Sequence, residues 1–378
     1  MRILVNPNVL APVGGIEIAM LQVNQELARR GHEIAALYRQ EGVQEPEWRE
    51  LTESMVRVPT FDFTKSSALR DLRALRPAIR AAGAAHPDIL HLNRVEQSVW
   101  GLLAARRARV PIVTTVRNEP QFPGVNLVGR LTNHFIAVSH YMRRRWTEAG
   151  VPADRITVIG NGVRAEEYPP GGAAELRKAR ADLGIAPDEF VLLYYGRIAP
   201  EKGVDVLLEA WRRLAPAKGT LLLVGVDELG PDREHLRALQ AQQPPGCRWV
   251  PVRKDVTAYL HAADVIVLPA LWQEPFGRVV IEAMATGRPV IASRVGGIPE
   301  TLTGEFASML VGPGDAAELT ARIAALQNWR RDNPWLGARC TQHIQDNFTL
   351  ERVVDQIEAV FTGVAASRRT AAPLGRVA

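Results

Sequence analysis

The sequence has few cysteines, no long apolar run and no clustered metal ligands. Cys247 and Cys340 are the only cysteines among 378 residues, too few for a disulfide framework. No apolar run approaches the roughly 18 residues that a membrane-spanning helix needs. The eight histidines lack the spacing of metal ligands, and the opening MRILVNPN resembles a strand more than a secretion signal. We therefore expect a cytoplasmic protein with two buried thiols and no tightly held metal or other cofactor.

The composition is that of an ordinary globular protein. Hydrophobic residues make up 47% and charged residues 23% of the chain, which argues against disorder. Because single cores stop growing near roughly 250 residues, the length predicts two domains. The formal net charge of +5 favours anionic partners such as phosphorylated ligands, nucleic acid or acidic lipids. Nucleic acid is disfavoured, because no basic run has aromatic residues interleaved for stacking on bases.

Short apolar runs alternate with helical patterns along the chain. A run at 2–6, a helical pattern over 16–27 and a run at 34–38 predict a βαβ unit. Further strands are predicted at 89–93, 111–116, 134–139, 190–195, 220–225, 247–252, 264–269, 288–293 and 308–313. This alternation predicts an α/β protein with two Rossmann-like, doubly wound parallel sheets, whose strand ends face a shared cleft.

Breaks in this alternation predict the domain limits. The first domain is expected over 1–165, and a linker over 166–185, where YPPGGAAE carries two prolines and two glycines. The second domain is expected over 186–346. A last helix over 347–365 is expected to pack back on the first domain, and 366–378 are expected to form a flexible tail.

Two cations lie at a predicted strand end in YGRIAPEKG, residues 195–203. Arg197 follows the strand and Lys202 precedes the next helix, a suitable arrangement for binding a diphosphate. The alternative is that both side chains only solvate the loop. The adjacent pair Gly14 and Gly15 could also bring backbone N–H groups close to an anion, although such pairs often only form a turn and the full G-x-G-x-x-G pattern is absent.

Two carboxylates flank the start of a predicted helix in EPFGRVVIE, residues 274–282. Glu274 lies in the loop and Glu282 inside the helix, so together they could accept hydrogen bonds from the hydroxyls of two polyols. The alternative is that Glu274 stabilises the helix start and Glu282 pairs with Arg278 at the i, i+4 spacing.

Several segments, in this order, resemble glycosyltransferase family 4, whose members have the GT-B fold. They are the GG-x-E at 14–17, VIGNGV at 158–163, YGRIAPEKGVDVLLEA at 195–210, EPFGRVVIEAMATGRPVIAS at 274–293 and GGIPE at 296–300. The resemblance spans nearly the whole chain. It implies a retaining, metal-independent transfer from a nucleotide-sugar co-substrate, with UDP the commonest nucleotide, to a hydroxyl of a small-molecule, lipid-linked or saccharide acceptor.

The resemblance also implies roles for individual residues. Arg197 and Lys202 would bind the donor diphosphate, Glu282 the ribose hydroxyls and Glu274 the hydroxyls of the donor sugar. Further donor contacts are implied for the backbone around Phe276, Gly277, Arg278 and Val279, for Gly14 and Gly15, and for the strand end at Val252, Arg253 and Lys254. No D-x-D metal motif is evident, so the charge of the leaving group would be met by cations and helix-end amides.

The first domain departs from the family pattern at one position. Members commonly carry a histidine where TTVRNEP, residues 114–120, has Arg117. Arg117 could offer positive charge to the leaving phosphate or to an anionic acceptor, with Asn118 and Glu119 on the acceptor side, or it could form a surface ion pair. His91 lies at another strand end that would face the cleft and is also expected on the acceptor side, although a lone histidine there is at least as often structural.

Three other classes of function stay open at this stage. They are a nucleotide-sugar binding protein that no longer transfers, a sugar-nucleotide epimerase, and a phosphorylase of similar architecture. In addition, the basic stretch over 65–80 could meet acidic lipids at the inner face of the membrane, or it could be a solvated helix face.

Overall fold

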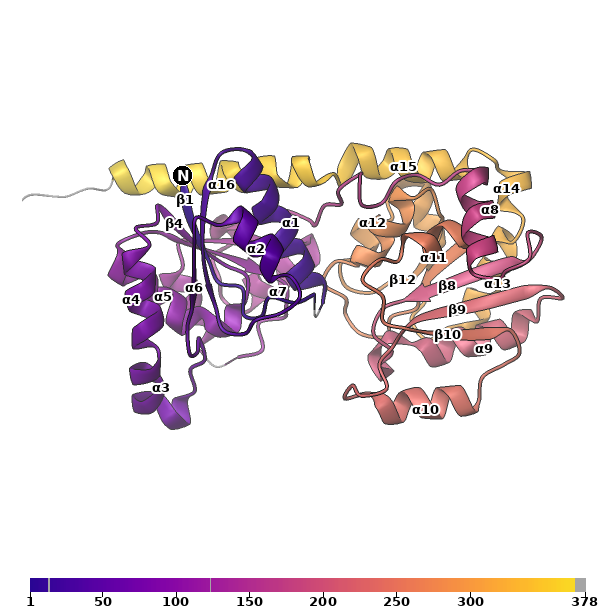
Figure 1. Cartoon of the computed structure of the whole chain (residues 1–378), viewed down its shortest axis with the longest axis horizontal. Helices are drawn as coiled ribbons and strands as arrows, with labels where there is room; N and C mark the ends of the chain where they lie inside the picture. The colour runs from indigo at the N-terminus through magenta and orange to yellow at the C-terminus, as the bar shows by residue number, and fades with distance from the viewer. Residues whose placement is uncertain (13, 123, 371–378) are drawn as a thin grey trace, which may run out of the picture. The chain divides into compact units, whose positions relative to one another are not determined.

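The computed structural model describes residues 1–12, 14–122 and 124–370, the last three of them by backbone only. Two compact units are formed. Unit 1 comprises residues 1–162 and the chain from Leu350 onward, and unit 2 is Val163–Thr349. Each unit is a Rossmann-like domain built on one parallel sheet, so the predicted fold class is confirmed (Figure 1).

Unit 1 contains a seven-stranded parallel sheet in the order β3-β2-β1-β4-β5-β6-β7. Its strands are β1 (Arg2–Val5), β2 (Glu33–Tyr38), β3 (Ser54–Arg57), β4 (Ile89–Leu92), β5 (Ile112–Val116), β6 (His134–Ala137) and β7 (Ile156–Val158). Its helices are α1 (Gly15–Arg29), α2 (Glu45–Leu51), α3 (Ala68–Ala74), α4 (Arg76–Ala84), α5 (Ser98–Ala108), α6 (Val125–Leu131), α7 (His140–Glu148) and α16 (Leu350–Thr370). The two edge strands, β3 and β7, are absent from the predicted strands.

Helices cover both faces of this sheet because the strands are apolar on both sides. Ile3 and Val5 of β1 pack in one cluster with residues of α1 and α16. Leu4, between them, packs in a second cluster with residues of α4 and α5, among them Trp100. Alternate side chains of one strand thus enter opposite cores.

Helix α16 packs against α1 in unit 1. Phe361 is fully buried in the cluster that contains β1, and Arg30 at the end of α1 donates to Asp355 at 2.7 Å. The helix runs five residues beyond the expected limit of 365. Residues 366–370 of the expected tail are therefore helical, and 371–378 lie outside the described residues.

Unit 2 contains a six-stranded parallel sheet in the order β10-β9-β8-β11-β12-β13. Its strands are β8 (Phe190–Tyr195), β9 (Gly219–Val226), β10 (Cys247–Pro251), β11 (Val265–Leu268), β12 (Val290–Ser293) and β13 (Leu310–Val311). Its helices are α8 (Ala173–Asp182), α9 (Val204–Leu214), α10 (Arg233–Ala241), α11 (Thr257–Ala262), α12 (Arg278–Ala285), α13 (Ala316–Leu326), α14 (Trp329–Asp332) and α15 (Leu336–Asn347). All six strands were predicted at these places.

The stretch over 166–185, expected to be a linker, contains helix α8. Glu175 caps this helix by accepting from the Gly172 amide at 2.8 Å. Arg180 is buried and donates to Asp264 at 2.7 Å. The prolines and glycines therefore lie before a helix that belongs to unit 2. Composition alone did not distinguish the linker from this helix.

Candidate active site

The loops that follow β8, β11 and β12 approach one another closely at the carboxyl edge of the sheet in unit 2. Leu271 N donates to Glu201 O at 2.9 Å, and Gly297 N donates to Glu274 O at 2.8 Å. Gly203 has φ +69°, and a Cβ there would lie 2.0 Å from Pro269 O. Only glycine fits such an approach, so these loops have a defined shape that carries the predicted cations and carboxylates.

Lys202 and Glu274, which lie 72 residues apart in sequence, meet between two of these loops. Lys202 Nζ lies 2.8 Å from Glu274 Oε2, with side chains 16% and 19% exposed. Trp272 Nε1 donates to the same oxygen at 2.8 Å, and the lysine ammonium lies 4.7 Å from the centre of the Trp272 ring. The structure thus brings together one predicted cation and one predicted carboxylate beside an exposed aromatic ring.

Arg197 lies at the same edge but pairs with other carboxylates. It donates to Glu201 and, at 2.9 Å, to Asp232 Oδ2. Partial burial acts to lower the pKa of Arg197, but these two carboxylates outweigh it and raise the pKa. The guanidinium is therefore held charged, and it is 55% exposed, so an anion can reach it.

Glu282 is held by a buried polar network at the start of α12. Arg278 donates to Glu282 Oε1 through Nε at 2.9 Å and Nη2 at 2.8 Å. The Tyr195 hydroxyl lies 3.0 Å from Oε2. The i, i+4 pairing that the sequence offered as an alternative is thus present, although Glu282 also has a partner on the end of β8.

Phe276 and Gly277 form the turn that leads into the amino end of α12. Phe276 is buried and packs edge-on against Phe348 at 6.0 Å between ring centres. Gly277 precedes the helix with φ +92°, a conformation that favours glycine. The first amides of the helix, from Arg278 and Val279 onward, follow directly, and such amides attract anions.

The strand end at Val252 and Arg253, for which further donor contacts are implied, is open at Val252. Val252 is 62% exposed, and Arg253 Nε donates to the Tyr259 hydroxyl at 3.3 Å. Neither residue contacts the lysine and glutamate pair in the structure.

In unit 1, the amino end of α1 contains a buried carboxylate besides the two glycines. Gly14 precedes the helix in an extended conformation and Gly15 is its first residue. Glu17 in the first turn is buried and accepts from Arg94. Glu17 thus supplies a negative charge at this helix start, and the Arg94 guanidinium balances it.

The residues after β5 each have a partner within unit 1. Arg117 donates to Asn161, an uncharged amide. Asn118 Nδ2 donates to Glu96 at 2.9 Å. Glu119 accepts from Tyr141 and from Arg145 at 3.2 Å, and these two lower its pKa, with the tyrosine as the larger cause.

His91 is buried at its strand end, which favours the structural alternative for this histidine. It is 2% exposed, lies 2.8 Å from Thr115 Oγ1 through Nε2, and packs edge-on against Phe361. Burial lowers its pKa to about 3, and the charge of Arg117 adds to this. In this environment His91 is a neutral histidine of the core.

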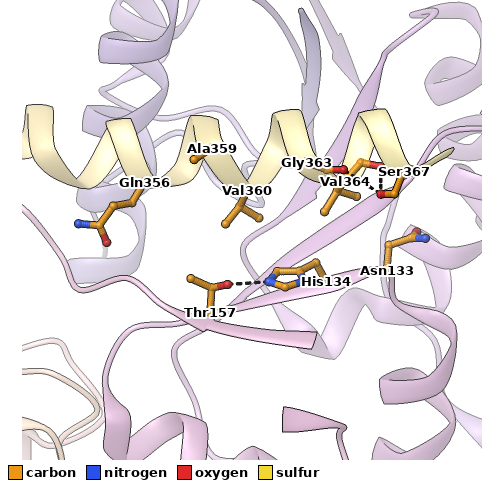
Figure 2. A pocket seen from close by; sticks show the side chains of 9 residues that line it. All are labelled: Asn133, His134, Thr157, Gln356, Ala359, Val360, Gly363, Val364 and Ser367. Carbon is orange, nitrogen blue, oxygen red and sulfur yellow. Dashed lines mark hydrogen bonds between the residues drawn. The ribbon is translucent and has the colours of Figure 1, made fainter. Parts of the chain in front are cut away.

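A cavity of about 750 Å³ lies between α16 and the β6–β7 edge of unit 1. Figure 2 shows its lining, with His134 bonded to Thr157 at 2.8 Å on the sheet side and one face of α16 opposite. The lining residues are Asn133, His134, Thr157, Gln356, Ala359, Val360, Gly363, Val364 and Ser367. None of the residues predicted from the sequence as part of a site lines this cavity.

Neither a cluster of metal-ligating side chains nor a helix able to cross a membrane is present in the described part of the chain. No group of three or more His, Cys, Asp or Glu side chains is placed to hold a metal ion there. No helix within the same residues combines the length and hydropathy required to cross a bilayer.

Several partners of the predicted residues were missed from the sequence. Glu201 is four residues from Arg197, so helical spacing could have indicated it. Asp232 and Tyr195 reach the site from another loop and from the end of a strand, and no local pattern marks them.

Two Rossmann-like domains, one with paired cations and carboxylates at its strand ends, define the general class, and comparisons with known proteins identify the family. Residues 13–167 match the model described as Glycosyltransferase Family 4, and 176–333 match that of Glycosyl transferases group 1. A D-inositol 3-phosphate glycosyltransferase of Geodermatophilus obscurus is 30% identical over 393 residues, covering 93% of this chain and 85% of the relative. One from Acidothermus cellulolyticus is 27% identical over 95% of this chain and 88% of the relative. The chain therefore belongs to glycosyltransferase family 4, and it is a glycosyltransferase.

Solved structures show the same fold. A crystal structure of Anabaena HepE in complex with UDP and glucose has a TM-score of 0.82 at 23% identity, covering 96% of this chain and 99% of that one. A glycosyltransferase from Rickettsia africae also has a TM-score of 0.82, at 20% identity, covering 96% and 98%. The GT-B fold implied by the sequence motifs is confirmed.

Proposed function

We propose that this glycosyltransferase moves a sugar from UDP-sugar to an acceptor hydroxyl with retention of the anomeric configuration. The observation that carries the proposal is the contact between Lys202 and Glu274 at 2.8 Å. This contact supports a site in which a cation for the diphosphate lies beside a carboxylate for the sugar hydroxyls. The Anabaena relative bound to UDP and glucose supports uridine as the base.

Both cations must gain a phosphate oxygen as a partner when the diphosphate binds. Exposed ion pairs contribute only about 0 to 1 kcal/mol, so Arg197 can leave Glu201 and Asp232 at little cost. The lysine pair is more enclosed, and there we expect Lys202 to keep Glu274 while adding a phosphate oxygen. A lysine ammonium has three donors, which permits both contacts at once.

Chemically, the bond between the anomeric carbon and the diphosphate oxygen breaks, and the oxygen takes the electron pair. The acceptor oxygen bonds to the same carbon on the same face, and its proton passes to the departing phosphate. Arg197, Lys202 and the amides at the start of α12 stabilise the negative charge as it develops. Within this proposal, Glu274 orients the sugar and does not become bonded to it.

For the acceptor we propose a phosphorylated polyol, bound by unit 1. The support is the printed activity of the curated relatives, which act on D-inositol 3-phosphate, and Arg117, which meets an uncharged amide in unit 1. Asn118 and Glu119 follow it in the same loop.

A panel of UDP-, GDP-, ADP- and dTDP-sugars in a thermal-shift assay tests the donor. Ligand at 100 times its Kd adds about 2.7 kcal/mol of stability, so one nucleotide should stand out. Release of UDP only when inositol 3-phosphate is added would separate transfer from mere binding, and an NMR spectrum of the product would show the anomer. A sugar epimerised without acceptor, or an inverted product, would contradict the proposal.

A peripheral contact with acidic lipids is supported by a group of exposed residues on α3, α4 and the turn before them, which we call the α3–α4 stripe. It consists of Lys65, Leu69, Leu72, Arg73, Arg76 and Arg80. Leu69 is 79% exposed, and none of the four cations forms an ion pair with any described residue. Each cation near an acidic surface contributes about 1 kcal/mol, and two exposed leucines add apolar contact.

Co-sedimentation with vesicles of phosphatidylglycerol or phosphatidylcholine tests this contact. Binding to the anionic vesicles should be strong at low salt and should be lost in a variant with Arg73→Glu and Arg76→Glu. Equal binding to both vesicle types, or none, would identify the stripe as a solvated helix face.

A further inference from the structure

The network around Glu282 contains more than a helix ion pair requires. The side chains of Arg278 and Glu282 are 10% and 9% exposed, so both charges are buried. A buried ion pair contributes no more stability, on average, than well-packed apolar residues. A purely structural role therefore does not account for these charges.

Two tyrosines from outside α12 complete the network. Tyr195, the last residue of β8, has its hydroxyl 3.0 Å from Glu282 Oε2 and 3.2 Å from Val279 O. Burial and the nearby Glu282 carboxylate raise the pKa of Tyr168 overall, although Arg278 also interacts electrostatically with the Tyr168 hydroxyl and acts to lower this pKa. Burial and the nearby carboxylate raise the pKa of Tyr195 well above its ordinary value, so this hydroxyl keeps its proton and can donate it.

The Glu282 carboxylate keeps one hydrogen-bond acceptor position that a ligand could use. A carboxylate offers about four lone-pair positions. Arg278 fills two on Oε1 and Tyr195 fills one on Oε2. One position on Oε2 remains, on a residue that is 7% exposed.

We infer that Tyr195 and Arg278 are positioning residues, which hold Glu282 so that its remaining acceptor position receives a ribose hydroxyl of the donor nucleotide. This inference rests on the proposed donor class. Arg278 fixes one oxygen through two donors, which prevents rotation of the carboxylate. Tyr195 fixes the other oxygen from the strand side, so little orientational freedom is lost when the ribose binds.

The test compares UDP with 2′,3′-dideoxy-UDP by isothermal titration calorimetry, using the full chain. The quantity measured is the ribose penalty, defined as the Kd of the dideoxy nucleotide divided by that of UDP. We expect a penalty of at least about tenfold in the unmodified protein, the value typical of one hydrogen bond to a charged group. In Tyr195→Phe the penalty should fall close to one, mainly because UDP binds more weakly while the dideoxy nucleotide binds as before.

Arg278→Lys is the second variant, since it keeps the charge and loses the two-point contact; its penalty should fall in the same way. Tyr194→Phe is the matched control, because the Tyr194 hydroxyl donates to Arg197 O at 2.6 Å and not to Glu282. Its penalty should equal that of the unmodified protein.

Other outcomes are distinguishable. If either positioning variant folds and binds both nucleotides less tightly by the same factor, the residues are only structural and the inference is overturned. If the unmodified protein binds UDP with no penalty, Glu282 does not read the ribose, and the inference fails while UDP remains a ligand. If the unmodified protein binds neither nucleotide, the uridine donor and this inference both fail.

Discussion

Replacing Lys202 with methionine tests the contact on which the proposed donor site depends. The change keeps the length of the apolar stem and removes the ammonium that lies 2.8 Å from Glu274. A hydrogen bond to a charged group contributes about 1.5 to 3 kcal/mol, and the variant also leaves Glu274 without a cation beside the incoming phosphates. We therefore expect the Kd for UDP to rise at least about tenfold, since each 1.4 kcal/mol is a factor of about ten.

The same structure limits the effect on stability. With side chains 16% and 19% exposed, the pair lies between surface pairs, at about 0 to 1 kcal/mol, and buried ones, whose breakage costs about 3 to 5 kcal/mol. We expect a loss of about 1 to 2 kcal/mol, or about 2 to 8 °C in Tm, so the variant should still fold.

Calorimetric titration with UDP and a melting curve without ligand measure the two quantities separately. Lys218→Met is the matched control, because Lys218 forms an exposed pair with Asp188 in the same unit, with side chains 70% and 63% exposed. It should leave both quantities nearly unchanged. A Kd for UDP within twofold of the unmodified protein in Lys202→Met would refute the assignment of Lys202 to the diphosphate.

Three further predictions concern stability. Because the pKa of His91 is about 3 when folded and 6.5 when unfolded, the unfolded chain binds the extra proton as the pH falls below 6.5. His91 should then cost about 1.4 kcal/mol per pH unit down to about pH 3, and His91→Gln should show a shallower loss in acid denaturant titrations; an equal slope would contradict burial. Gly363→Ala should stabilise the chain by about 0.5 to 1 kcal/mol, since nothing lies within 4 Å of a Cβ there. Gly203→Ala should destabilise the chain, because its Cβ would clash with Pro269 O. Equal melting curves for Gly203→Ala and the unmodified protein would show that the loops can move to accommodate the added Cβ. Asp264→Asn should lower the free energy of unfolding by about 3 kcal/mol or more, because Arg180 would lose its buried carboxylate, and a loss below about 1 kcal/mol would count against this.

The strands that were predicted and those that were missed differ in one physical respect. Strands inside a parallel sheet are buried on both faces and appear as continuous apolar runs, as in Phe190–Tyr195. β3 and β7 are the two edges of the first sheet. β3 has two exposed residues and β7 has only three residues in all, so neither gave a run that stood out.

For the site, the sequence placed the residues on the correct local structure but did not indicate which of them touch. Glu274 lies in a loop and Glu282 inside a helix, as predicted from the proline and glycine before the apolar pattern. The local alternative of an Arg278 pair with Glu282 was also visible, since i, i+4 contacts depend only on helix geometry.

His91 shows the limit of this local reasoning. Its place at a strand end follows from the apolar run around it, but its exposure depends on Phe361, which packs against the ring from a helix 270 residues later in the chain. No pattern around residue 91 contains that information.

By itself, the sequence determined the alternation of strands and helices, the loops at the strand ends and the family, because each is written in short-range apolar periodicity and in local motifs. The tertiary structure alone decided that Lys202 meets Glu274, that Arg197 meets Asp232 and that Tyr195 meets Glu282. These pairs join loops and strands that are distant along the chain, and they come together because parallel strands align their carboxyl ends at one edge of a sheet. Which side chains then come within hydrogen-bonding distance depends on strand order and on loop shape, which only the folded chain defines.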